Sequence, residues 1–318
     1  MLSYPDFAEK QILLINSDKI KNLALQNDNL IIKDENWKIL NKVSVYKIFT
    51  IFVIWDFTIT TKLVNKLLEF GIWIQCLWYN LKPKFSIWSP LEWNFLLREK
   101  QYQNKFNLIY AKQLIFQKTS NQLKLLTKIR NKDKNLKQDI KKIRKLIKNI
   151  EKVENTDTLR WIEWNVAKLF FKNYFKEQNW IMRAPRTKID ITNFLLDMGY
   201  TYLFYFIEAN LNLYGFDTYK GVFHTQFFER KSLVCDLQEP FRAIIDRKIK
   251  NMYSLKQIDE KDFKKRKWIY QLKFEFYNKY SALFLKEILS YKEQIFKYIR
   301  NYYLAVIKEK EVLPIFSI

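Results

Sequence analysis

The sequence contains very few glycine, histidine and cysteine residues, and each shortage excludes a class of protein. Only 4 of its 318 residues are glycine, and they form neither a phosphate-binding GxxxxGK loop nor a GxGxxG turn. An enzyme driven by ATP hydrolysis is therefore not expected. The single histidine excludes the HExxH zinc signature and any zinc site built from three histidines. The two cysteines, Cys76 and Cys235, form no CxxC pair, which fits a reduced cytoplasmic protein.

Long apolar runs and a secretion signal are also missing. The longest apolar run near the N-terminus, from Ile48 to Trp55, ends at Asp56 and is far too short to span a bilayer. No basic segment precedes an apolar core at the N-terminus, where Pro5 and Asp6 interrupt the chain. We therefore expect a cytoplasmic protein that is not inserted into a membrane.

Basic residues, in contrast, are in large excess. The chain has 56 Lys and Arg against 33 Asp and Glu, which gives a formal net charge of +23. This is more than solubility requires of a single domain, and it favours a polyanionic partner. An AT-rich genome would explain abundant Lys, Asn and Ile, but not why acidic residues lag so far behind.

The first 90 residues are predicted to be a small β-rich domain. Short runs rich in Ile, Val and aromatic residues are typical of strands, at Gln11 to Ile15, Asn29 to Lys33, Val43 to Tyr46, Ile48 to Trp55 and in IWIQCLW. One helix is expected in TKLVNKLLEFG, capped by Thr60 or Thr61 and ended by Gly71. Pro83 and Pro90 place the domain boundary, and we expect this first domain to mediate dimerisation.

Residues 91–318 are predicted to form a larger, all-α catalytic domain, so the fold class is α+β. Glycine and proline become scarce there, and apolar residues recur at intervals of three and four. From Lys118 to Lys152 the chain is dominated by Lys and Arg, with an apolar stripe at helical spacing. Two interpretations remain open for this stretch: a solvated helix face, or a face that contacts DNA phosphates.

The only histidine lies in a segment that favours a metal site. A lone histidine is more often a packed residue than a ligand. His224, however, closely follows Gly221, and a helix expected to begin near Ser232 carries Asp236 and Glu239. Their three-residue separation puts both carboxylates on one face of that helix. Carboxylates converging with a neutral imidazole suit Mn²⁺ or Mg²⁺.

The segment YKGVFHTQFFERKSLVCDLQEPFRAIID resembles the signature of the CRISPR-associated protein one family, the catalytic subunit of spacer acquisition. That family carries Gly-x-x-His, then Ser-Leu, then Asp-Leu-x-Glu-x-x-Arg after two residues. The matching residues here are Gly221, His224, Ser232, Leu233, Asp236, Leu237, Glu239 and Arg242, followed by Asp246. A match of this length and spacing is far more specific than a lone glycine motif.

Two upstream segments extend the resemblance. The helix with the family's first metal-binding glutamate is similar to WIEWNVAKLFFKNYF, which places that residue at Glu163. The family's Asp, Asn, Leu-Leu and Gly-Tyr are matched by Asp190, Asn193, Leu195, Leu196, Gly199 and Tyr200. The family's glutamate is commonly followed by Gly, where this chain has Trp164. The opening YPDFAEKQILLI suggests a type V system.

The resemblance implies a metal-dependent integrase that inserts spacer DNA into a CRISPR array. Glu163, His224 and Glu239 would hold Mn²⁺ or Mg²⁺, and Asp236 would also act in catalysis, orienting a ligand or contacting water on the metal. The implied partners are double-stranded prespacer and repeat DNA, a second copy of the chain, and the small CRISPR-associated protein two.

Two rival functions use the same features. A general metal-dependent DNA nuclease would need the same ligands, because water would replace the DNA 3′-hydroxyl as nucleophile. A non-enzymatic architectural DNA-binding protein would use the acidic residues only for structure.

Overall fold

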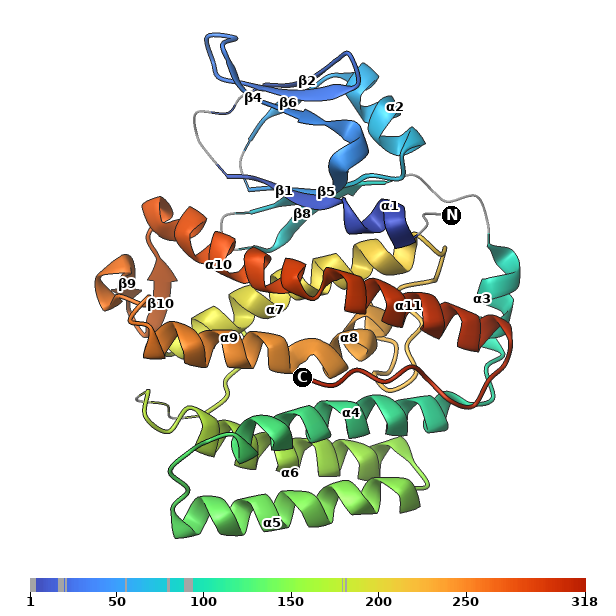
Figure 1. The fold of residues 1–318 in the computed structure, drawn as a ribbon, viewed down its shortest axis with the longest axis vertical. Helices are drawn as coiled ribbons and strands as arrows, with labels where there is room; N and C mark the ends of the chain where they lie inside the picture. Colours follow the sequence, from blue (N-terminus) through green and yellow to red (C-terminus); the bar gives the residue numbers. More distant parts are fainter. Residues whose placement is uncertain are drawn as a thin grey trace.

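The computed structural model describes residues 4–16, 20, 22–54, 56–78, 81–88, 94–178, 180 and 182–318. The N-terminal part of the chain forms two four-stranded sheets (Figure 1). The first has the order β1-β5-β7-β8, with β1 at Gln11–Ile15, β5 at Ile48–Val53, β7 at Trp73–Leu77 and β8 at Pro83–Ile87. The second has the order β4-β3-β2-β6, with β4 at Ile39–Ser44, β3 at Asn29–Lys33, β2 at Asn22–Gln26 and β6 at Thr58–Ile59.

The elements expected in this part form for the predicted reasons. Strand β5 is buried at every residue, because Ile, Phe and Val suit a strand that is covered on both faces. Helix α2 spans Thr61–Glu69, and the Thr60 side chain caps it by accepting a hydrogen bond from the Leu63 N–H. Gly71 follows with a φ of 62°, a conformation that favours glycine after a helix. The short helix α1 at Tyr4–Ala8 precedes β1.

Three strands were not predicted, and one was misplaced. Strand β4 ends at Ser44 and a 3₁₀ turn covers Val45–Lys47, where the sequence predicted a strand from Val43 to Tyr46. The missed strands are β2, β6 and β8. Strand β6 has only two residues, too few for a pattern, whereas β2 was missed although Leu23 and Leu25 alternate along it and pack in the core. Asn27 and Asp28, both at positive φ, turn β2 back into an antiparallel pairing with β3.

The predicted boundary falls around residues 89–93, which lie outside the described residues, as does Pro90. Pro83 does not end the first sheet, because it is the first residue of β8, the edge strand of that sheet. Proline is tolerated at that position, where its missing N–H is not needed.

The rest of the chain is mostly helical, as predicted. The helices are α3 Phe95–Tyr102, α4 Asn107–Thr127, α5 Lys134–Asn149, α6 Thr156–Tyr174, α7 Ile191–Asn212, α8 Ser232–Gln238, α9 Arg242–Ser254, α10 Tyr277–Ser290 and α11 Lys292–Ile307. Short 3₁₀ turns lie at η2 Ile150–Lys152, η3 Glu239–Phe241, η4 Glu260–Asp262 and η5 Phe274–Phe276. A hairpin of β9 Phe263–Arg266 and β10 Ile269–Leu272 interrupts the helices, so this region is not all-α.

Helix α7 is the centre of the helical part, and Figure 1 shows it among α8, α9, α10 and α11. It is buried along most of its length. A Cβ on Gly199 would lie 2.5 Å from Ile245 of α9 and 2.8 Å from Phe284 of α10, so glycine permits this close packing. The first sheet packs on α7 through Phe49 against Phe206, with ring centroids 5.5 Å apart.

Helices α4, α6 and α5 form a separate layer at the lower end of the view in Figure 1. The predicted apolar stripe of α5 is confirmed, since Leu136, Ile140, Ile143 and Ile147 are buried. Its exposed face carries Lys134, Lys137, Lys141, Lys142, Arg144, Lys145 and Lys148. Among the described residues, none of the helices has the length and apolar character needed to cross a membrane.

Candidate active site

The predicted site residues lie on α6, on the loop before α8, and on α8 with the 3₁₀ turn that follows it. Glu163 lies in the middle of α6, whose first turn is capped by the Asn155 side chain. Helix α8 begins at Ser232, as predicted, but it ends at Gln238, and Glu239 starts the 3₁₀ turn η3. His224 lies in the loop before α8.

Asp236 is directed at the loop that carries His224. Its carboxylate is fully buried and accepts hydrogen bonds from the backbone N–H groups of Val222 (2.6 Å), Phe223 (3.0 Å) and His224 (2.9 Å). Its Oδ1 also lies 2.6 Å from His224 Nδ1. A Cβ on Gly221 would lie 2.6 Å from Asp236 Oδ2, which accounts for the glycine of the Gly-x-x-His pattern. Asp236 therefore fixes the imidazole and leaves its Nε2 free of this contact.

Asp236 and Glu239 have different partners, although the sequence predicted both carboxylates on one helix face. The helix changes to a 3₁₀ turn between them, and Pro240 follows Glu239 directly. Glu239 Oε2 lies 2.7 Å from Lys118 Nζ and 3.2 Å from Arg242 Nε. The two carboxylates therefore serve separate tasks.

Lys118 connects Glu239 to Glu163. This lysine belongs to α4, is 6% exposed, and its ammonium also pairs with Glu163 Oε1. The sequence assigned Lys118 to a basic helix face that is either solvated or in contact with DNA phosphates, and for this residue both interpretations are wrong because it is buried. The apolar residues beside Lys118 on α4 pack into the interior, and the Lys118 side chain is buried together with them.

Charge balance keeps the carboxylate and the ammonium ionised. Burial alone would raise the pKa of Glu239, but Arg242, Lys118 and His224 outweigh it and lower the pKa to about 2. Burial alone would lower the pKa of Lys118, but Glu163 and Glu239 outweigh it and raise the pKa. Arg242 matched the sequence motif without a predicted role, and the structure places it against Glu239.

The side chains suit a divalent cation, although a lysine holds the carboxylates. Glu239 Oε2 is buried, yet neither of its ion-pair contacts has the geometry of a hydrogen bond. Two carboxylates and an imidazole are donors that Mn²⁺ and Mg²⁺ accept. Within the described part of the chain, no three His, Cys, Asp or Glu side chains are gathered as a ready-made metal centre. That Glu163, His224 and Glu239 share one ion stays a prediction.

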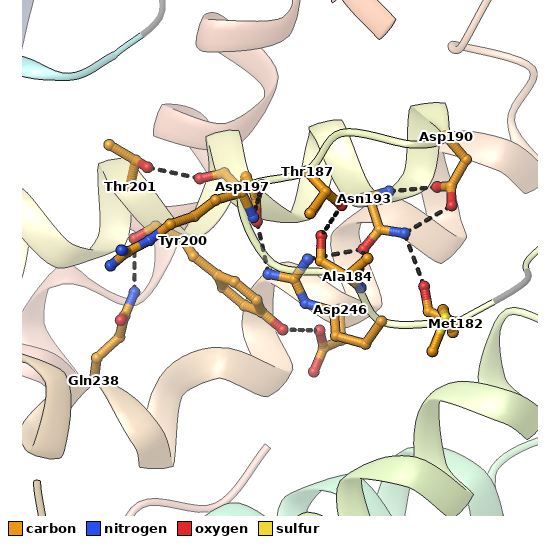
Figure 2. A network of polar contacts seen from close by, with 12 residues as sticks. Met182, Ala184, Thr187, Asp190, Asn193, Asp197, Tyr200, Thr201, Gln238 and Asp246 are labelled. Atoms are coloured by element: carbon orange, nitrogen blue, oxygen red, sulfur yellow. Dashed lines mark hydrogen bonds and ion pairs between the residues drawn. The ribbon is translucent and has the colours of Figure 1, made fainter. Parts of the chain in front are cut away.

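A polar network on α7 supports the turn that carries Glu239 (Figure 2). Gln238 donates a hydrogen bond of 2.6 Å to the backbone oxygen of Tyr200. The Tyr200 hydroxyl donates to Asp246 Oδ1 at 2.5 Å, and Arg242 lies over the Tyr200 ring at 4.8 Å. The residues that flank Glu239 on either side are therefore anchored to the central helix.

The same network holds the segment before α7. Asn193 accepts from the Ala184 N–H at 3.0 Å and donates to the Met182 backbone oxygen at 2.9 Å, as Figure 2 shows. Asp197 accepts from Arg183 at 2.7 Å. Asn193, one of the residues that match the family pattern, fixes the loop before α7.

Carboxylates and an imidazole are the kinds of side chain with which enzymes that cut or join phosphodiesters hold their metal ions. The sequence profile described as "CRISPR associated protein Cas1" matches residues 14–286 of this chain. The chain belongs to this family.

Individual relatives agree with the family assignment. The chain is 34% identical over 225 residues to a protein named CRISPR-associated endonuclease Cas1 1 from Thermodesulfovibrio yellowstonii, covering 67% of this chain and 71% of the relative. A casposase bound to integration product has a similar fold, with a TM-score of 0.78, 23% identity and coverage of 95% and 92%. A chain of a Cas6-RT-Cas1–Cas2 complex gives 0.83 at 22% identity over 97% of this chain, which spans only 36% of that longer one.

Proposed function

We propose that this protein is a metal-dependent DNA integrase that inserts spacer DNA into a CRISPR array, by attack of a 3′-hydroxyl on a phosphodiester. The observation that supports the proposal is that Lys118 links Glu163 to Glu239, while Asp236, on the helix that leads into Glu239, holds the His224 ring. Family membership supports it, because curated relatives are named CRISPR-associated endonucleases.

The roles of the residues follow from their contacts. Glu163, Glu239 and His224 would hold Mn²⁺ or Mg²⁺, and the ion would supply a positive charge to polarise the phosphodiester and orient the attacking hydroxyl. Asp236 positions the His224 ring through the Nδ1 contact and the loop through three backbone N–H groups. Arg242 keeps Glu239 ionised and anchored beside Tyr200. Exchange of one phosphodiester for another needs no nucleotide fuel, in agreement with the missing phosphate-binding loop.

Double-stranded prespacer and repeat DNA are the proposed substrates. The net charge of +23 and the basic face of α5 provide cations for phosphate contacts. The likeness to a casposase bound to integration product supports strand joining. We place this activity in the cytoplasm, and the type V assignment suggested by the opening segment stays a prediction.

A companion subunit and a second copy of the chain complete the proposal. A structural neighbour is part of a complex whose title includes Cas2, which supports a small companion of that kind. The edge strand β4 and its surroundings expose Trp37, Ile39, Leu40 and Tyr46, which favours pairing of two copies through this region. Two dimers would supply active sites for both ends of a prespacer.

A nuclease that uses water is the second candidate, because the same side chains would serve it. The test uses short labelled duplexes with free or blocked 3′-hydroxyls, a repeat-containing target, Mn²⁺ or Mg²⁺, and the companion subunit. We expect branched products on a denaturing gel only with free 3′-hydroxyls. If blocking leaves all product formation intact, water is the nucleophile and the nuclease replaces the integrase.

A further inference from the structure

Lys118 lies where a cation is expected in the site. Its ammonium pairs with Glu163 Oε1 from α6 and lies 2.7 Å from Glu239 Oε2 at the start of η3. Lys124 on α4 and Lys128, directly after the helix, are exposed, whereas Lys118 is buried. An ammonium is costly to bury unless carboxylates compensate it, and here two carboxylates do so.

Without a metal ion, the four charges at this place already balance. Glu163 and Glu239 supply two negative charges, and Lys118 and Arg242 supply two positive ones. A divalent ion added to these four groups would leave them with an excess of two positive charges, of which the Asp236 carboxylate beside His224 would offset one. Such an excess opposes binding strongly where few water molecules screen it.

The ion and the ammonium also compete for the same atoms. A small divalent ion binds carboxylate oxygens at about 2.0–2.2 Å, whereas an ammonium hydrogen-bonds them at about 2.7–2.9 Å. Both cannot lie between Glu163 Oε1 and Glu239 Oε2. Glu239 Oε2 also lacks a well-directed hydrogen bond, so its hold on the ammonium is electrostatic and can be exchanged.

Of the two basic residues, Lys118 is the one able to leave. Arg242 is held over the Tyr200 ring at 4.8 Å and is the first residue of α9, which begins directly after the turn η3. The ammonium of Lys118 lies at the end of a flexible four-carbon side chain, so it can move away from either carboxylate.

We propose that Lys118 is a built-in cation that occupies the position between Glu163 and Glu239 and is displaced when the divalent ion binds. This inference rests on the proposed function, because it concerns the same metal site. Without an ion, the lysine keeps the buried Glu239 and the partly exposed Glu163 together and the site folded. The divalent ion then binds by displacing the ammonium, and this displacement lowers the affinity of the site for the ion.

The test measures Mn²⁺ binding to the full chain by titration calorimetry, together with thermal unfolding without and with MnCl₂. Lys118→Met removes the ammonium and keeps the apolar stem, and Lys128→Met removes an exposed charge from the end of the same helix as a matched control. We expect Lys118→Met to bind Mn²⁺ roughly tenfold more tightly, a typical scale for coupled binding. Its unfolding temperature should be lower without Mn²⁺ and should rise more with it. Lys128→Met should match the wild type.

An unchanged or weaker Mn²⁺ affinity in Lys118→Met overturns the exchange while leaving the proposed metal site intact. Absence of Mn²⁺ binding to the wild type and to both variants overturns the metal-dependent function and the exchange with it. Should Lys118→Met fail to fold, a crystal structure of the wild type with Mn²⁺ decides: the ammonium must have left at least one carboxylate. If it still bonds both beside the bound ion, the exchange is wrong.

Discussion

Asp236 holds His224 at two points, because its Oδ1 lies 2.9 Å from the His224 backbone N and 2.6 Å from the ring Nδ1. A buried carboxylate at that ring nitrogen fixes the tautomer with hydrogen on Nδ1 and directs Nε2 outward. The catalytic histidine of the proposed mechanism is therefore positioned by a residue twelve places further along the chain.

Asp236→Ala should remove the contact that holds the His224 ring in the tautomer with hydrogen on Nδ1. Because the chain has one histidine, long-range ¹H–¹⁵N spectra report it without assignment. We expect the wild type to show the Nδ1–H form and the variant to shift toward the Nε2–H form, with strand transfer lowered about ten- to hundredfold. A variant spectrum that keeps the wild-type tautomer would show that Asp236 does not orient the ring.

Removing a proposed metal ligand should abolish chemistry but not DNA binding. We expect Glu163→Ala and His224→Ala to lose strand transfer while retaining most duplex affinity, because phosphate contacts come from other surfaces. Gel assays of joining and filter binding measure the two properties. Glu154→Gln, at an exposed glutamate before α6, is the control and should behave as wild type. Full joining activity in either alanine variant would end the ligand assignment.

The basic face of α5 should set the salt dependence of DNA binding. Lys137, Lys141 and Lys145 are exposed along this helix, and reversing them to Glu should flatten the slope of log K against log salt. Each lost phosphate contact removes about 0.9 from that slope. Reversal of Lys256, Lys261 and Lys308, which are exposed outside α5 and outside the proposed dimer edge, changes the net charge equally and serves as the control. An equal slope in both triple variants would mean that α5 is an ordinary solvated face.

The apolar edge of β4 should control self-association. Ile39 is 53% exposed and Leu40 is 47% exposed, although both are large and apolar. We expect Ile39→Lys combined with Leu40→Lys to convert a dimer into a monomer in light scattering, with little effect on folding, because burying charge at the interface is costly. Ile315→Lys places the same charge at another exposed apolar residue and should leave the dimer intact. A double variant that still dimerises would exclude this edge.

Asp246 should make stability depend on pH. Burial raises its pKa to about 7, although Tyr200, Arg242, Arg183 and Lys118 oppose the shift, and its Oδ2 has no hydrogen-bond partner. Since the folded-state pKa lies above the unfolded value of about 3.9, the stabilising contribution is complete below about pH 4 and is lost as the pH rises through 7. The stability of the wild type relative to Asp246→Asn should therefore fall between about pH 5 and about pH 8 in urea unfolding. If the free energy of unfolding differs between the wild type and Asp246→Asn by the same amount at both pH values, the pKa shift is contradicted. The exposed control Asp157→Asn should differ from the wild type by the same amount at both.

The sequence by itself determined the elements whose causes are local. Thr60 caps α2 and Gly71 ends it, because a side-chain oxygen and a permissive φ act within a few residues. The apolar stripe of α5 likewise follows from helical spacing alone. The Gly-x-x-His and Asp-x-x-Glu spacings also identified the family, because those residues are close in sequence.

The tertiary structure determined which charged side chains contact one another. Nothing around Lys118 distinguishes it from neighbouring lysines in the sequence, yet the packing of α4 against α6 and η3 turns it toward Glu163 and Glu239. The division of labour between Asp236 and Glu239 depends on where α8 ends and on which loop folds against it. Helical periodicity specifies a buried face but not the charged group that another helix presents to it, because that choice depends on contacts between residues far apart in the chain.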